Sequence, residues 1–168
     1  MIWQSLTTQQ VTFWVYSALD LNDSFAKIYI ELGEICLKHL NRAEEAREYL
    51  ITALEIEPSN LRTLILLVEY NISKVDKIMQ KHSSGKKGFT AAAIARSTVE
   101  SNVYLESAIR GYSKAIHMYP SKQVLYLGRG GLLLRQKNFM AATNDFHSAF
   151  MIHGYESTSF YQVRQILL

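Results

Sequence analysis

One short pattern occurs twice in this sequence, and the two copies are thirty-four residues apart. The frame is Ala-x3-aromatic-x2-Ala-x4-Pro/Gly, and its members are Ala108, Tyr112, Ala115 and Pro120, then Ala142, Phe146, Ala149 and Gly154. Steps of four and three residues place the first three positions on one face of a helix, and the proline or glycine ends that helix. A fixed interval of this length is typical of helix hairpins that stack side by side. We therefore expect an all-α fold of antiparallel helix hairpins.

Two weaker copies of the frame precede this pair and predict further hairpins. Their members are Ala46, Leu50, Ala53 and Pro58 in the better copy, and Val11, Val15 and Ala18 in a degenerate one. From these copies we expect a single domain over residues 1–168. It would comprise a partial repeat at 9–23, a repeat at 25–58, an irregular part at 59–120, a repeat at 121–155, and the start of a further or capping helix at 156–168.

The middle of the chain does not fit the period. Pro58 and Pro120 are sixty-two residues apart, so the interval holds either one repeat with an insertion or two repeats with a deletion. We interpret it as two irregular hairpins, because Ser83 to Gly88 would break the chain, Phe89 to Ser101 again favours a helix, and Asn102 could cap a further helix over 103–119. A basic loop with two glycines, near residues 81–88, would interrupt the helices before it.

Polar residues mark the expected starts of other helices. Asn41 is followed three residues later by Glu44, which is the spacing of a capping box. Ser121 and Asn138 precede the two helices that we expect in the last full repeat. We expect each of these side chains to accept a hydrogen bond from a free amide at its helix terminus.

Composition limits the kind of protein. Two prolines and eight glycines in 168 residues favour helices over an all-β fold, which needs frequent turns. The single cysteine, Cys36, excludes a disulfide framework and fits a reducing compartment. The longest aliphatic run, Leu64 to Val68, is too short to cross a bilayer. We expect an intracellular, cytoplasmic protein, and leave a nuclear or ciliary location open.

The spacing of residues in both helices of these hairpins resembles a tetratricopeptide repeat. In that family the first helix carries aromatic-x2-Leu-Gly-x2-Tyr and the second carries Ala-x3-Phe before a proline. The matching first helices are Tyr29-x2-Leu32-Gly33-x2-Cys36 and Tyr126-x2-Arg129-Gly130-x2-Leu133. The resemblance covers about residues 11–155 and implies a right-handed superhelix. The small residues would let two helices approach closely, and Tyr112 or Phe146 would fill the space between one hairpin and the next.

The resemblance also implies a concave groove lined by the first helices of the hairpins. The exposed positions that we expect in this groove are Lys27, Ile30, Glu34, Leu37, Arg62, Ile65, Glu69, Val124, Leu127 and Gly131. This mixture of apolar and acidic side chains would suit an amphipathic peptide or helical segment of a partner protein.

No grouping of residues predicts an enzyme, a metal site or a cofactor site. The five histidines are scattered over different expected helices, and no pair has a metal-binding spacing. Cys36 occupies a position that is usually apolar, so we interpret it as a buried, inert thiol. The sequence Ser83 to Gly88 contains Gly-Lys but lacks the earlier glycine of a phosphate-binding loop. A catalytic set assembled only in space stays open.

Two functions from different classes follow. The first is a non-enzymatic scaffold or adaptor that binds a protein partner in the groove. The second is binding of nucleic acid or another polyanion through a basic patch, whose members are Lys74, Lys77, Lys81, Lys86, Lys87 and Arg96. The apolar C-terminal helix that we expect at 156–168 would continue a longer array, dock on a partner or mediate self-association.

Overall fold

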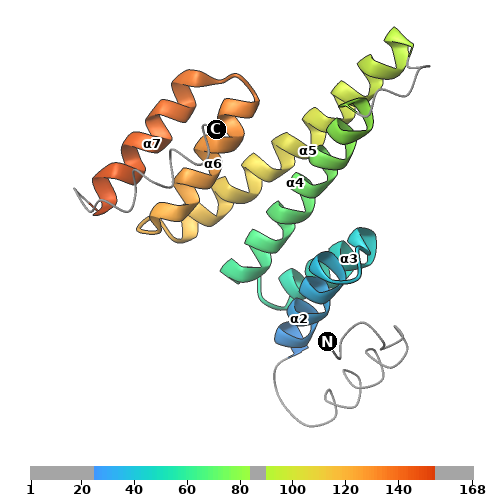
Figure 1. Ribbon diagram of the computed structural model, residues 1–168. Coiled ribbons are helices and arrows are strands. Elements are labelled where there is room, and N and C mark those ends of the chain that lie inside the picture. The colour runs from blue at the N-terminus through green and yellow to red at the C-terminus, as the bar shows by residue number, and fades with distance from the viewer. Residues whose placement is uncertain (1–24, 84–89, 154–168) are drawn as a thin grey trace. The chain divides into compact units, whose positions relative to one another are not determined.

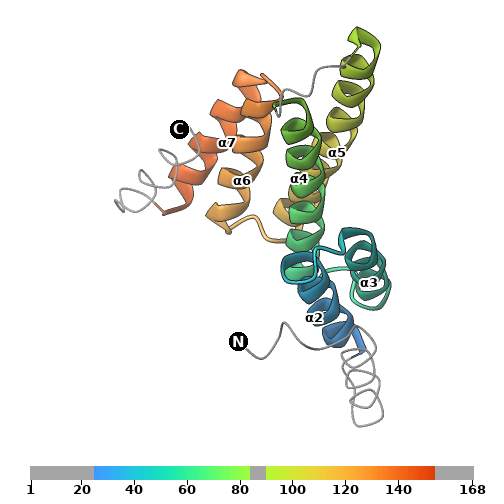
Figure 2. The ribbon, with the colours of Figure 1, turned by 45° about the vertical axis from the view of Figure 1, so that its right-hand side comes forward.

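The computed structural model describes residues 25–83 and 90–153, and every regular element in these two ranges is a helix. The helices are α2 (Phe25–Lys38), α3 (Ala43–Ile56), α4 (Leu61–Ser83), α5 (Ala91–Met118), α6 (Gln123–Arg135) and α7 (Phe139–His153) (Figures 1 and 2). The predicted all-α class is therefore confirmed over the described residues. The partial repeat at 9–23 and the C-terminal helix at 156–168 lie outside them.

The chain forms two compact units, which divide between Thr63 and Leu64 in the first turn of α4. The first unit contains the hairpin of α2 and α3. The second contains most of α4 together with α5, α6 and α7. The single-domain organisation expected for residues 1–168 stays a prediction.

The hairpin of α2 and α3 is held by a close approach at Gly33. A Cβ atom built on Gly33 would lie 2.7 Å from Cγ and Cδ2 of Leu50, which is too close for any side chain without movement. Ala46 and Ala53, the other frame positions of α3, are completely buried. α3 ends at Ile56, two residues before Pro58, which cannot continue a helix in that position. The frame that predicted this hairpin therefore marks its buried face.

The turn between α2 and α3 differs from the expected capping box. α3 begins at Ala43, and the residue at its N-cap is Arg42, whose side chain makes no capping hydrogen bond. Asn41 instead has φ of 53°, in the left-handed region that asparagine tolerates better than most residues. The same correction applies to α6, which begins after Lys122 and has no side-chain cap from Ser121. Asn138 caps α7 as predicted, because its Oδ1 accepts a hydrogen bond from the amide of Ala141 at 3.3 Å.

The hairpin of α6 and α7 repeats the contact seen in the first unit. A Cβ atom on Gly130 would lie 2.7 Å from Cε1 of Phe146, and Ala142 and Ala149 are buried beside it. Gly130 and Phe146 occupy the same frame positions as Gly33 and Leu50. Phe146 therefore packs inside its own hairpin. Tyr112 behaves as predicted, because it reaches the next hairpin: a Cβ on Gly128 of α6 would lie 2.5 Å from its ring.

The interpretation of residues 59–120 as two irregular hairpins is wrong. α4 has 23 residues and α5 has 28, against 14 in each of α2 and α3, so the extra sequence lengthens both helices of one hairpin. Asn102 is exposed in the middle of α5, and no proline or glycine interrupts the helix around it. The true cap is Thr90, whose side chain accepts from the amide of Ala93. The first turns of α5 extend away from α6 and α7 (Figure 1).

The core of the second unit lies where α4, α5 and α6 meet. Val68 and Val75 from α4 pack with Leu105 and Ala108 from α5 and with Leu132 from α6. A Cβ atom on Gly111 would lie 2.6 Å from Cγ2 of Val68, so these two helices also approach closely. Val75 lies between Lys74 and Lys77 in the sequence, so two basic residues of α4 begin next to this core.

Candidate functional site

The predicted groove residues of the first unit differ in exposure. Lys27 and Arg62 are exposed, and Glu34 and Leu37 are half-buried. Ile30 is only 3% exposed, so the expectation that it lines an open groove is wrong. Isoleucine is apolar, so the hydrophobic effect favours burial of Ile30 over exposure in a groove. The available surface in this unit is therefore more polar than expected.

Arg62 and Glu34 belong to an ion cluster in the first unit. The guanidinium of Arg62 donates to both carboxylate oxygens of Glu31, at 2.6 and 3.2 Å, and its Nε donates to Glu34 at 3.1 Å. Lys38 donates to the other oxygen of Glu34 at 3.0 Å. Two carboxylates thus face two cations, and this part of the predicted groove is balanced in charge rather than acidic.

The cluster shifts the ionisation of its members. Hydrogen bonds from Lys38 and then Arg62 lower the pKa of the Glu34 carboxyl below its ordinary value. Hydrogen bonds to Glu31 and then Glu34 raise the pKa of the Arg62 guanidinium. Each side chain is partly exposed, so water screens these pairs and each contributes little to stability. Their main consequence is that Arg62 is held against α2 by two carboxylates.

The predicted groove residues of the second unit also divide by exposure. Val124 is 59% exposed, whereas Ile65, Glu69 and Gly131 are half-buried. Leu127 is 4% exposed, so the expectation of an exposed position is wrong there too. α6 packs against both α5 and α7, and a helix between two neighbours buries more than one face. Only Val124 among the five presents a large apolar surface.

A buried ion pair in the second unit was not predicted. Arg129 donates to both oxygens of Asp145, at 2.8 and 2.7 Å, and to Oγ of Ser113 at 3.0 Å. Asp145 is buried, and its hydrogen bonds raise the pKa of the Arg129 guanidinium. These contacts tie α6 to both α5 and α7. Two residues of the sequence could have indicated this pair. Arg129 stands where the tetratricopeptide pattern has leucine, and Asp145 lies on the inward side of the next helix.

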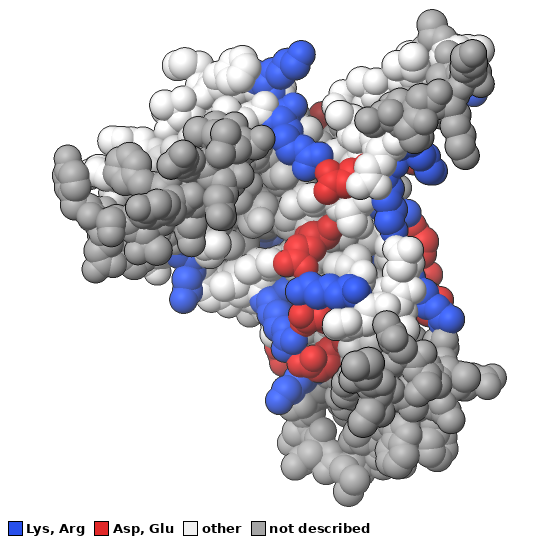
Figure 3. Space-filling view, in the orientation of Figure 1, with Lys and Arg blue, Asp and Glu red and all other residues white. Residues whose placement is uncertain are grey.

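The predicted basic patch is divided between the two helices of the long hairpin. Lys74, Lys77 and Lys81 lie on α4 and Arg96 lies exposed on α5, whereas Lys86 and Lys87 lie outside the described residues. Acidic and basic side chains are next to one another on the face in Figure 3, so no broad field of one sign covers it. The described basic residues of the patch therefore form a small local group and not an extended basic surface.

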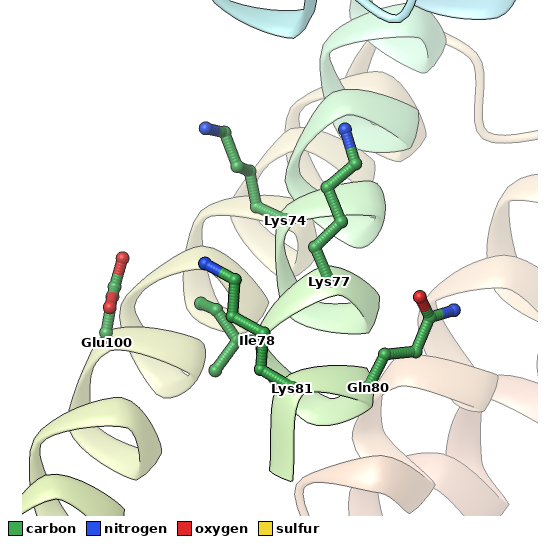
Figure 4. Close-up of a pocket in the computed structure, with 6 residues that line it drawn as sticks. All are labelled: Lys74, Lys77, Ile78, Gln80, Lys81 and Glu100. Atoms are coloured by element: carbon green, nitrogen blue, oxygen red, sulfur yellow. The ribbon is translucent and has the colours of Figure 1, made fainter. Parts of the chain in front are cut away.

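Three of these lysines line one pocket, which was not predicted. It has a volume of about 420 Å³ and is lined by Lys74, Lys77, Ile78, Gln80, Lys81 and Glu100. In Figure 4 the amino groups of Lys74 and Lys81 lie on the side of α4 nearer Glu100, whereas the amino group of Lys77 is set apart from them. The amino group of Lys74 lies 5.7 Å from the centre of the Tyr70 ring. The lining thus includes three positive charges, one negative charge and the apolar side chain of Ile78.

Metal and thiol chemistry have little support among the described residues. Within 25–83 and 90–153, no three side chains of His, Cys, Asp or Glu are grouped closely enough to hold a metal ion. Cys36 is buried as expected, and that burial raises the pKa of its thiol, which keeps it protonated. No helix in the same ranges has the length and apolar character needed to cross a bilayer.

The sequence matches no model of a known protein family, and no curated protein is significantly similar to it. The resemblance to tetratricopeptide repeats therefore depends on the residues of the chain and on the contacts that they make.

Proposed function

We propose that this chain is a helical scaffold of the tetratricopeptide type that binds a segment of a partner protein and carries out no reaction of its own. The observation that carries the proposal is one contact made twice. Gly33 against Leu50 and Gly130 against Phe146 are the same pair of frame positions, and a Cβ atom added to either glycine would lie 2.7 Å from the facing side chain. Repetition of one hairpin is how such proteins build surfaces for partners.

The link between hairpins adds support. Tyr112 of α5 packs on Gly128 of α6, so an aromatic residue of one frame contacts the first helix of the next hairpin. Burial raises the pKa of the Tyr112 hydroxyl, as expected for a ring enclosed between helices. A right-handed superhelix over the full chain is part of the proposal. It would require the same link between each hairpin and the one that follows.

The exposed groove residues indicate the chemistry of the partner. Lys27, Glu34 and Arg62 offer charges of both signs, and Glu31 shares Arg62 with Glu34. A partner carboxylate could replace Glu34 on Arg62, because Glu34 would keep its ion pair with Lys38. Leu37, which is half-buried on the same helix as Glu34, offers an apolar contact in the first unit. We propose an amphipathic partner segment with acidic and basic residues on its polar face.

Charge reversal tests this proposal. The double variant Glu34→Lys with Arg62→Glu inverts the exposed cluster while keeping its total charge. We expect a partner captured from the cells of origin by the original protein to be lost by this variant. Lys122→Glu, at an exposed position before α6, is the control and should retain the partner. Circular dichroism must show that each variant is folded. Retention of every partner by the folded double variant would contradict binding at this surface.

Binding of nucleic acid through the basic patch stays a second prediction. The local gathering of Lys74, Lys77 and Lys81 favours it. Against it, none of the described residues that line the pocket is aromatic, whereas single strands are usually held by stacking of bases on aromatic rings. A filter-binding assay at low salt decides between these two possibilities, because contacts to a phosphate backbone are strongest there.

A further inference from the structure

The pocket in the long hairpin arises from the spacing of residues on α4. Lys74, Lys77 and Lys81 follow one another at intervals of three and four, so they share one face of the helix. Ile78 lies on the same face and is 8% exposed. It is therefore the apolar part of the pocket lining, and the lysine stems can pack around it.

The number of cations favours a ligand with clustered negative charge. A lysine amino group is a compact point charge with three donors, and lysine is a common phosphate-binding residue. Three such groups from two turns of a helix can surround tetrahedral oxygens from several directions. The lining contains three lysines and one glutamate, so its net charge is positive. Several phosphate groups in one small molecule match three neighbouring cations better than the single carboxylates of an acidic peptide do.

We propose that this pocket binds a compact polyphosphate, meaning a small molecule that carries several phosphate groups close together. Its volume of about 420 Å³ is in the range of small-molecule sites. Such a ligand would place negative charge near all three lysines at once. This activity goes beyond the proposed binding of a protein segment and does not depend on it.

Glu100 gives the site a distinctive electrostatic feature. It lines the pocket from α5, opposite the lysines of α4, and its carboxylate repels an anion. Removing its charge should therefore tighten binding, whereas removing a lysine charge should weaken it. General attraction of an anion to a basic protein would not depend on which charge is removed. Opposite changes in affinity on removing Glu100 and a pocket lysine therefore indicate a defined site.

The direct experiment is isothermal titration calorimetry of the full chain with inorganic tripolyphosphate. We expect Lys77→Gln and Lys81→Gln each to weaken binding about five-fold, the size expected for one charge pair near a surface. Glu100→Gln should tighten binding by a similar factor. The matched controls are Lys114→Gln and Glu106→Gln, which remove the same charges from exposed positions of α5 outside the pocket lining.

The outcomes are distinct. Weakening by both pocket lysine variants, tightening by Glu100→Gln and unchanged binding by both controls support the site. No heat at millimolar tripolyphosphate, or equal effects of Lys114→Gln and Lys81→Gln, would overturn it. A titration with single-stranded oligouridine separates the two sources of phosphate. Tighter binding of the oligonucleotide at equal phosphate concentration would reject a compact polyphosphate in favour of nucleic acid.

Discussion

At the scale of single residues, glycines decide where two helices can touch. Gly33 and Gly130 stand at the same place in two hairpins, and each faces a larger side chain of the partner helix at a distance that excludes a Cβ. Glycine weakens a helix by roughly 1 kcal/mol relative to alanine. Here that cost is offset by the packing that the missing side chain permits. Both positions were predicted, because the glycine keeps a fixed place in the pattern of the first helix.

Gly130→Ala should lower the free energy of unfolding by about 1 to 2 kcal/mol. The added methyl group would meet the ring of Phe146, and overpacking of this kind costs more than the gain in helix propensity returns. Denaturant unfolding measures the loss. The same substitution combined with Phe146→Leu provides the control, because a smaller side chain leaves room for the methyl group. An equal cost in both backgrounds would show that the glycine and the ring are not in contact.

Ion pairs are the second residue-scale feature, and Glu34 makes them depend on pH. Its pKa is lowered by Lys38 and Arg62, so the stability that it contributes is present above the ordinary carboxyl pKa. That contribution is lost as the pH falls through the lower pKa of the folded state. Glu34→Gln should therefore reduce the loss of melting temperature on acidification from about pH 5 downward.

Thermal melts over a series of acid buffers measure this effect. Glu55→Gln, at an exposed position of α3, is the matched control and should leave the acid profile close to that of the original protein. Coincidence of the Glu34→Gln profile with the original would show that the cluster around Arg62 is not formed in solution.

At the scale of elements, the length of α5 is the largest departure from the repeat pattern. Helix-forming residues from Ala91 to Ala95 and the absence of proline or glycine from there to Arg110 let one helix run through the place where two were expected. Asn102 is a strong cap only where a helix starts, and nothing near it stops the helix that precedes it. The local preference for a cap was outweighed by the continuity of the helix.

Two alanine substitutions test that conclusion by the sign of their effects. Asn102→Ala should raise the free energy of unfolding by about 0.5 kcal/mol, because alanine is the better residue inside a helix. Asn138→Ala should lower it by about 1 kcal/mol, because Asn138 caps α7 through the amide of Ala141. Chemical denaturation of both variants gives the comparison. A loss at Asn102 as large as that at Asn138 would mean that a helix begins there.

At the scale of the whole molecule, local patterns were predictable and long-range partners were not. The buried faces of α3 and α7 follow from spacing within one helix, so Ala46 and Ala142 were identified correctly. Contacts of Arg62 with Glu31 and of Arg129 with Asp145 join helices, and they depend on how each helix is rotated against its neighbour. Burial of Ile30 and Leu127 was missed for the same reason.

The pocket shows the same limit. The basic patch was predicted from the concentration of basic residues between Lys74 and Arg96, and the spacing of Lys74, Lys77 and Lys81 puts these three on one face of α4. The presence of Glu100 opposite them follows only from the pairing of α4 with α5. That pairing could not be predicted while the segment was interpreted as two hairpins. The position of Glu100, whose charge should weaken anion binding, could therefore not be predicted from the sequence.

Solution NMR of the full chain tests the repeated hairpin contact most directly. Nuclear Overhauser effects should connect the Hα protons of Gly33 with the methyl groups of Leu50, and those of Gly130 with the ring of Phe146. Observation of both would show that one hairpin is built twice in this chain. Assigned spectra in which both glycines lack these connections would contradict the scaffold.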